Sequence, residues 1–254
     1  MRVLVCIKRV PAVAGRITLT PDERAIDMKY LGFAVGPHEE CAVEGAIRLI
    51  EEHGGESVVL TLGPAEALEQ LRDALALGVN RAIHLVTDGA EWDPGSTAAA
   101  IVDAIRADEA ASGPFDLVLL GNEAADSGGY QVGVRIGQAL GRPMVAGVKG
   151  LTVAGGIASA EQEVAGGRDV YDLPLPAVVA VLEGLNLPRF PSVPGRLRAK
   201  SKPVATSNPA RGEQGLDLVR LVVPQGVSKQ AVILGSGPDA APAVVEMLAG
   251  LGVI

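Results

Sequence analysis

Four short apolar runs, separated by longer amphipathic stretches, constrain the fold of this chain more than any other feature. They occupy residues 3–7, 58–62, 82–86 and 116–120. Runs of this kind are typical of parallel strands that are buried on both faces. Since helical periods lie between them, the pattern predicts an α/β fold with a doubly wound, mostly parallel sheet and helices on both faces.

The helical stretches carry recognisable start and stop signals. Pro37 suits a first helical position, Glu39 and Glu40 suit the positive end of the helix dipole, and Gly54 can end that helix. Three further helices are predicted, over residues 64–77, 94–107 and 130–140. The side chains expected to face the sheet are Val43, Ala46, Ile47, Ile50, Leu68, Leu71, Leu75, Ile101, Val102, Ile105, Val132, Ile136 and Ala139.

From about Val145 the pattern changes to shorter apolar segments joined by Gly-rich turns. These predict partly antiparallel strands that extend the sheet at one edge. A polar stretch after Lys202 predicts an irregular arm, and residues 242–251 predict one last short helix.

Composition excludes several classes of protein. The 254 residues are 48% hydrophobic, enough for one sizeable core, and a pI near 5.0 argues against nucleic acid as the main partner. Two cysteines, Cys6 and Cys41, lie in apolar contexts and fit a reducing compartment. No apolar run is long enough to span a membrane, and a strand that starts at Arg2 leaves no room for a signal peptide. We therefore expect a cytoplasmic protein without direct membrane insertion.

Residues 186–202, NLPRFPSVPGRLRAKSK, form a basic segment in an acidic chain. The segment has five basic residues and no acid, whereas the chain has a formal net charge of −8. Pro188, Pro191 and Pro194 each remove a backbone donor, so we expect an extended arm without a helix or a central strand. Phe190 and Val193 are placed like the tip of a docking loop.

The loop over residues 121–129, GNEAADSGG, follows a buried strand and precedes a helix. Its glycines allow a ligand to approach the backbone closely, and the helix N-terminus that follows can hold a phosphate. The same glycines are compatible with an ordinary strand-to-helix turn. The loop matches neither GxGxxG nor a Walker A motif.

These features resemble the electron transfer flavoprotein β subunit. The arm matches through Asn186, Pro188-Arg189-Phe190, Val193-Pro194 and Arg198-Ala199-Lys200. Further similar segments are RVLVCIKRVP, GPHEECAVEGAIRLIEE, TLGPAEALEQLRDALALGVNRAIHL and LVLLGNEAADSGGYQVG. Together they span most of residues 1–205 in the family's order, and the last fifty residues are only loosely similar.

The resemblance implies an adenine-nucleotide α-hydrolase-like fold and a buried AMP. The residues implied at the nucleotide are Cys6, Gly36, Pro37, His38, Glu39, Leu62, Gly121, Asn122, Glu123, Ala124, Ala125, Asp126, Ser127, Gly128, Gly129, Tyr130, Gln131 and Val132. The chain departs from the family where Gly36 replaces an Asn and His38 replaces an aromatic ring.

The resemblance also implies a carrier role for the complex. It implies an α-subunit partner that holds or shares FAD, electron donors that are flavin dehydrogenases of the acyl-CoA dehydrogenase type, and a membrane-bound quinone reductase as acceptor, as in fatty acid oxidation. The residues implied in docking are Arg189, Phe190, Val193, Leu197, Arg198 and Lys200. Val193 holds the place of the family's larger apolar anchor.

We therefore expect a nucleotide-binding domain over residues 1–185, a partner-recognition loop over 186–202 and a C-terminal arm over 203–254 that packs on the α subunit. The sequence contains no catalytic or metal-ligand motif, which suits a carrier. One alternative is a bifurcating flavoprotein of the same fold, with a second FAD in place of AMP and NADH as donor. A more remote alternative is a stand-alone nucleotide-binding sensor module.

Overall fold

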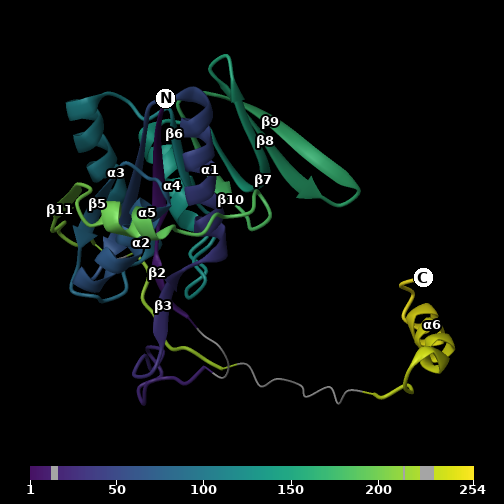
Figure 1. Ribbon diagram of the computed structural model, residues 1–254. Coiled ribbons are helices and arrows are strands. Elements are labelled where there is room, and N and C mark those ends of the chain that lie inside the picture. The colour runs from purple at the N-terminus through teal and green to yellow at the C-terminus, as the bar shows by residue number, and fades with distance from the viewer. Residues whose placement is uncertain (13–16, 214, 224–231) are drawn as a thin grey trace.

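A nine-stranded sheet organises the chain in the computed structural model, which describes residues 1–12, 17–213, 215–223 and 232–254 (Figure 1). The strands of this sheet are β1 (Arg2–Ile7), β4 (Glu56–Gly63), β5 (Arg81–Val86), β6 (Leu117–Gly121), β7 (Met144–Ala154), β8 (Ile157–Val164), β9 (Gly167–Pro174), β10 (Ala177–Val181) and β11 (Val204–Ser207).

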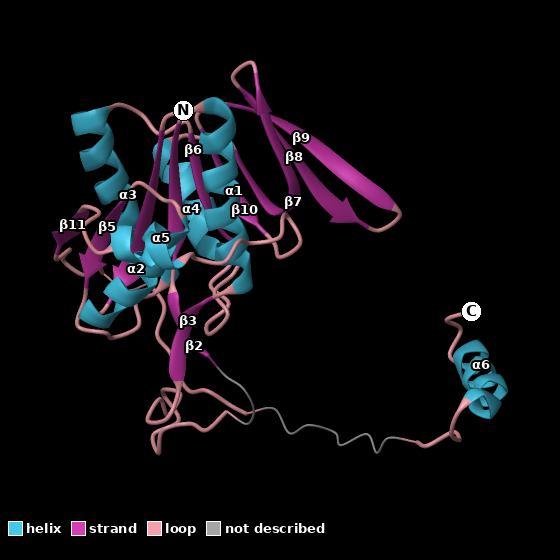
Figure 2. Cartoon of the chain, viewed as in Figure 1, coloured by secondary structure: helices cyan, strands magenta, loops and turns pink. Residues whose placement is uncertain are grey.

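The strand order is β11-β5-β4-β1-β6-β10-β7-β8-β9. All pairs from β11 to β7 are parallel, and the two pairs that involve β8 are antiparallel. The predicted mostly parallel sheet with an antiparallel edge is confirmed. Figure 2 shows β8 and β9 extending away from the parallel part of the sheet.

Helices cover both faces of the sheet, as expected from the apolar periods. α1 (Pro37–His53) and α2 (Leu68–Leu77, preceded by the 3-10 turn Ala65–Ala67) pack on the face that carries Val3 and Val5. The opposite face, which carries Leu4 and Cys6, packs against α3 (Pro94–Ser112) and α4 (Gln131–Leu140). Two predicted inward positions are wrong, because Leu68 and Ala139 are exposed.

A second, two-stranded antiparallel sheet was not predicted. β2 (Arg9–Ala12) follows β1 almost at once and pairs with β3 (Gly32–Val35). Both strands are short, and Pro11 lacks a backbone donor, so neither gives the apolar signal of a sheet strand. The hairpin projects beyond the carboxyl ends of the central strands (Figure 1).

The basic segment contains a helix, so the expectation of an arm without one is wrong. α5 (Val193–Ala199) begins after Ser192, whose side chain accepts a hydrogen bond from the backbone of Gly195. Pro194 lies in the first helical turn, where a backbone donor has no intrahelical partner and its loss costs nothing. Pro194, which was expected to prevent a helix in this segment, therefore favours the start of one.

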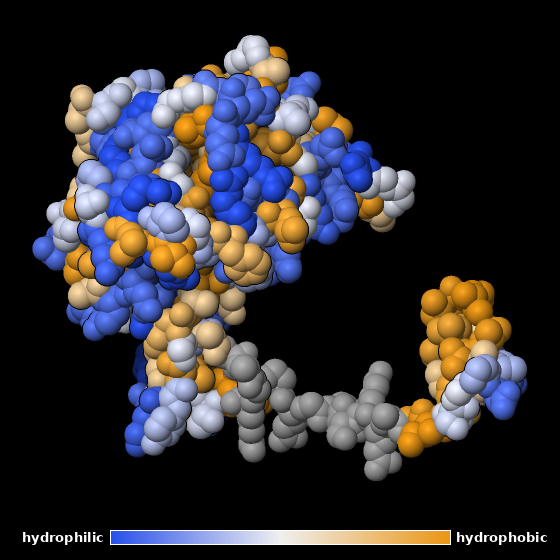
Figure 3. All heavy atoms as spheres, viewed as in Figure 1, coloured by the Kyte–Doolittle hydropathy of each residue, from blue (hydrophilic) through white to orange (hydrophobic). Residues whose placement is uncertain are grey.

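The C-terminal region also differs from the expected irregular arm. β11 lies within it and extends the sheet beside β5. Part of the predicted arm, residues 214 and 224–231, lies outside the described residues. The predicted last helix is confirmed as α6 (Ala241–Gly250), after the 3-10 turn Pro238–Ala240, and Figure 3 shows it as predominantly hydrophobic. No helix in the described ranges is long and apolar enough to cross a membrane.

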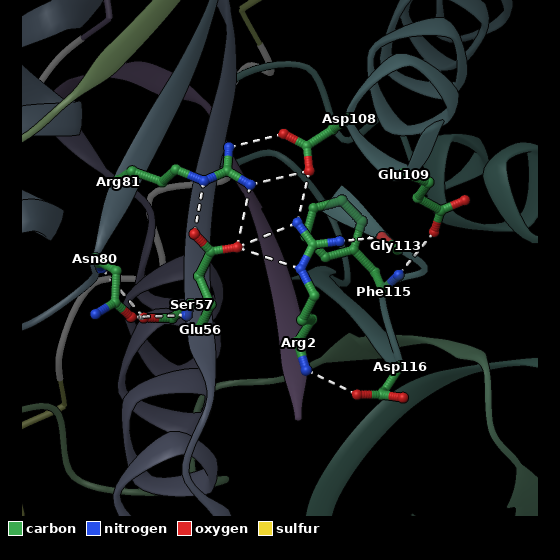
Figure 4. Close-up of polar contacts among 10 residues, drawn as sticks. All are labelled: Arg2, Glu56, Ser57, Asn80, Arg81, Asp108, Glu109, Gly113, Phe115 and Asp116. Carbon is green, nitrogen blue, oxygen red and sulfur yellow. Dashed lines mark hydrogen bonds and ion pairs between the residues drawn. The ribbon is translucent and has the colours of Figure 1, made fainter. Parts of the chain in front are cut away.

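An ion-pair network joins the amino ends of the central strands (Figure 4). The Glu56 carboxylate pairs with both Arg2 and Arg81, and Asp108 of α3 pairs with the same two guanidinium groups. Hydrogen bonds from Arg81 offset the burial of both acids and lower the pKa of Glu56 and of Asp108. The network ties α3 to the sheet at the edge opposite the candidate nucleotide site.

Candidate functional site

The predicted nucleotide residues lie at the topological switch point of the sheet. The chain leaves β1 toward the helices of one face and leaves β6 toward α4 on the other, so the crevice lies between the carboxyl ends of β1 and β6. Ligands of doubly wound folds bind in this crevice. Cys6 pairs in register with Leu120, and β4 on the other side of β1 carries Leu62 near its carboxyl end.

The loop between β6 and α4 is a tight hairpin of its own. Ala124 and Gly128 exchange both backbone hydrogen bonds, at 3.0 and 2.9 Å. Gly128 and Gly129 have φ values of 77° and 45°, a region that side chains other than glycine rarely adopt. The loop leads into the N-terminus of α4, where Val132 N donates to Gly129 O at 3.2 Å, and Tyr130 N and Gln131 N have no acceptor among the described residues. This is the geometry of an anion-binding helix N-terminus.

Glu39 lies at the centre of the crevice. It belongs to the first turn of α1, is 4% exposed, and its carboxyl group contacts the backbone of Gly36 and Gly121. An added Cβ would lie 2.5 Å from Glu39 Oε2 at position 36, and 2.7 Å from Cδ at position 121. At both positions the Glu39 carboxyl group occupies the space that a Cβ would need.

The Glu39 carboxyl group is buried without full hydrogen bonding. Its Oε2 has no hydrogen-bond partner among the described residues. Burial raises the pKa of Glu39 to about 7, and Asp126 adds to the effect. A buried oxygen of this kind is costly unless a partner is supplied, so the site favours a ligand that can donate to or accept from Glu39.

Lys8 belongs to the same site and was missed by the sequence analysis. Its Nζ lies 2.7 Å from Glu91 Oε1, 2.9 Å from Asp126 Oδ1 and 3.1 Å from Ser127 Oγ. Lys8 directly follows β1, and its position at the carboxyl end of a central strand was the available signal. It places a cation against the loop predicted to hold phosphate.

His38 and Asn122 are anchored by backbone groups. His38 Nδ1 accepts a hydrogen bond from Glu183 N at 2.8 Å, and its Nε2 lies 3.6 Å from Glu123 Oε1. Asn122 Oδ1 accepts from Gly147 N at 2.8 Å, so the Asn122 side chain connects the loop to β7. Both residues therefore shape the loop.

Other predicted residues contribute buried or partly buried apolar side chains to the crevice. Cys6 and Cys41 are buried free thiols, and burial raises the pKa of Cys6 to about 12, which keeps it protonated. Val132 and Leu62 are partly buried against the core on the α3–α4 face. The structure thus brings the predicted segments 36–39 and 121–132 to one place.

The basic segment is held firmly at its start. Arg189 donates to Glu44 at 2.8 Å and to Glu51 at 2.6 Å, and Asn186 donates to the Cys41 carbonyl at 2.9 Å. Although burial favours the neutral form, hydrogen bonds from Arg189 and Arg48 lower the pKa of the Glu44 carboxyl. The guanidinium group of Arg189 therefore bonds to α1, and these bonds fix the start of the basic segment against that helix.

Apolar side chains beyond this anchor point into solvent. Phe190 is 94% exposed, Val193 74% and Leu197 62%. Arg198 and Lys200 form no ion pair within the described part of the chain, whereas Arg196 pairs with Asp73. A pocket of about 230 Å³ lies between α2 and α5, with Gly78, Phe190 and Arg198 in its walls. We name the exposed surface of residues 190–200 the arm surface.

One further hollow lies away from these two places. A hollow of about 450 Å³ lies at the carboxyl ends of β5 and β11, beside Trp92 and Arg211. Within the described ranges, no group of three or more His, Cys, Asp or Glu residues could hold a metal ion.

Comparisons with known proteins match most of the chain. The family model "Electron transfer flavoprotein domain" matches residues 26–211. A Syntrophomonas wolfei protein named electron transfer flavoprotein subunit beta is 36% identical over 225 residues, 88% of this chain and 86% of the relative. The Homo sapiens protein of that name is 35% identical over 86% of this chain and 84% of its own length. For the Bacillus subtilis protein of that name, identity is 38% over 67% of this chain and 65% of the relative.

Proposed function

The chain belongs to the electron transfer flavoprotein family as a homologue of its β subunits, and from this we propose that it is the β subunit of a heterodimeric electron carrier. Subunits of this kind carry electrons and are not enzymes by themselves. In the proposed complex the α subunit holds FAD or shares it with this chain, and FAD supplies the redox chemistry.

The observation that carries the docking part of the proposal is the anchored arm surface. Arg189 and Asn186 hold its base against α1, and Phe190, Val193 and Leu197 extend from it into solvent. A preformed loop loses little entropy when it binds, and an exposed apolar tip can supply most of the binding energy. We propose that this surface docks flavin dehydrogenases of the acyl-CoA dehydrogenase type.

We propose that AMP binds in the crevice between β1 and β6. Gly128 and Gly129 allow close approach to a phosphate. The Glu39 carboxyl group, which occupies the space above Gly36 and Gly121, has an oxygen without a hydrogen-bond partner among the described residues. Gly121 to Val132 would surround phosphate and ribose, and Cys6, Leu62 and Gly36 to Glu39 would surround the base. Bound AMP would stabilise the folded chain by mass action.

We further propose that the flavin passes its electrons to a membrane-bound quinone reductase and that residues 203–254 pack on the α subunit. The C-terminal part of this arm supports the second proposal. α6 leaves Val244, Val245 and Met247 exposed in the isolated chain, and a partner surface would cover them.

A bifurcating flavoprotein is the second candidate. The acidic residue at position 39 and the Gln131-Val132-Gly133 sequence favour it, and a second FAD would then occupy the crevice. The stand-alone sensor module is not favoured, because the arm surface would have no role in it.

Purification of the chain with its α subunit, followed by mass identification of the released nucleotides, tests the proposal. We expect one FAD and one AMP for each heterodimer. Two FAD and no AMP would replace the proposal with the bifurcating candidate. Stoichiometric FAD on the isolated chain would contradict the assignment of FAD to the α subunit.

A further inference from the structure

Lys8 contacts the loop that is proposed to hold the phosphate of a nucleotide. The N-terminus of α4 offers backbone donors, whereas the backbone N–H groups of Ser127, Gly128 and Gly129 already donate within the loop. The side chains around both are mainly acidic. Asp126 lies in the loop, Glu123 lies at its start, and Glu39 lies beneath it. A phosphate dianion at this position needs a cation to offset those charges. Among the lysines and arginines in the described part of the chain, Lys8 is the one that forms an ion pair with this loop.

The contacts of Lys8 differ in how easily a ligand can replace them. The Asp126 side chain is 16% exposed, whereas that of Glu91 is 62% exposed. An ion pair with an exposed, mobile carboxylate contributes little, so Glu91 is the partner that a phosphate oxygen would replace. Asp126 and Ser127 would continue to hold the ammonium group against the loop.

We infer that Lys8 is a phosphate-binding residue of the nucleotide site, with Glu91 as the carboxylate that occupies its third donor when phosphate is absent. Burial would lower the pKa of Lys8, but Glu91 and Asp126 outweigh it and raise that pKa. The side chain is therefore charged at neutral pH. The inference rests on the proposed function, because it presumes that the crevice binds an adenine nucleotide.

The test compares AMP with adenosine, which lacks the phosphate. Nucleotide-depleted heterodimer is titrated calorimetrically with each ligand, as wild type, Lys8→Met and the control Lys149→Met. Lys149 likewise pairs with an exposed carboxylate, that of Glu163, but lies on β7. We expect Lys8→Met to weaken AMP binding about ten- to a hundredfold, the range for one hydrogen bond between charged groups, with adenosine binding unchanged. The control should bind both ligands as wild type does.

Equal losses for AMP and adenosine would show that Lys8 only clamps the loops, and no loss of AMP binding would show that phosphate lies elsewhere. Glu91→Gln provides an opposite test that does not remove the ammonium group. It should tighten AMP binding, because a competing carboxylate is gone, and unchanged or weaker binding would overturn the exchange of partners. A wild-type complex that binds neither ligand would overturn the nucleotide site itself, and the role of Lys8 with it.

Discussion

The carboxyl group of Glu39 lies against the backbone of Gly121, at the carboxyl end of β6. A Cβ at position 121 would be 2.7 Å from Glu39 Cδ and 3.0 Å from Oε2. This contact joins the first turn of α1 to the start of the loop that leads into α4. The first prediction follows from it.

Gly121→Ala should destabilise the chain and reduce its nucleotide content. The added methyl group forces the Glu39 carboxyl away from its position, and overpacking of this kind costs about 1–3 kcal/mol. Urea unfolding of the heterodimer measures the loss. Gly167→Ala is the matched control, because nothing lies within 4 Å of its Cβ position. If both variants unfold at the same urea concentration, Glu39 does not occupy the space above Gly121.

Glu39 should make the stability of the nucleotide-depleted heterodimer depend on pH. Its folded-state pKa is raised from 4.5 to about 7, mainly by burial. The folded state therefore keeps a proton that the unfolded state loses above its own pKa. This contribution is fully present below about pH 4.5 and is lost as pH rises to about 7, with a loss of roughly 3 kcal/mol.

Glu39→Gln should remove this dependence, because the amide does not titrate. The free energy of unfolding of both proteins is measured by urea denaturation between pH 4.5 and 8. The difference between them should shift in favour of the variant as pH rises. Parallel curves over that range would mean that Glu39 titrates with an ordinary pKa.

Gly129→Val should lower nucleotide retention and stability together. A β-branched side chain resists the φ of 45° and would block the approach of a phosphate to the loop. Backbone strain of this kind costs on the order of 1–3 kcal/mol. Gly113→Val is a control for strain alone, because Gly113 also has positive φ but lies after α3, at the amino end of the sheet. Nucleotide content is measured after denaturation. Unchanged content in Gly129→Val would show that the loop is an ordinary turn with no role in nucleotide binding.

Val193→Ala should slow reduction of the complex by its dehydrogenase without altering the flavin spectrum. The substitution removes roughly 1–2 kcal/mol of apolar burial at the docking site, which should appear mainly as faster dissociation. Val170→Ala on β9 is a control with a similarly exposed valine. Equal reduction rates for Val193→Ala and the control, at dehydrogenase concentrations below saturation, would exclude Val193 as an anchor.

Arg198→Glu should instead lower the association rate, most clearly at low salt. Arg198 has no ion-pair partner within the described ranges, so its charge is available to steer an acidic partner. Stopped-flow reduction at several salt concentrations measures the effect, with Arg168→Glu on β9 as the control. A rate that is independent of salt in wild type and variant alike would contradict electrostatic steering.

The amino-acid sequence by itself determined the alternation of strands and helices, the antiparallel edge and the positions of the glycine loop and the basic segment. A sheet buried on both faces requires apolar runs, and helices on its faces require apolar residues at helical spacing. Local sequence patterns therefore predict these features. Prolines were less informative. Pro194 suggested the absence of a helix, whereas its place in the first turn of α5 became evident only from the backbone.

Only the tertiary structure decided which side chains meet. Lys8 reaches Glu91 and Asp126, which are 83 and 118 residues away in sequence, because the carboxyl ends of β1, β5 and β6 lie at one edge of the sheet. Arg189 similarly turns back to Glu44 instead of facing a partner. Hydrophobic periodicity states which face of an element is buried, but the partners of a polar side chain depend on strand order and loop path, which no local pattern encodes.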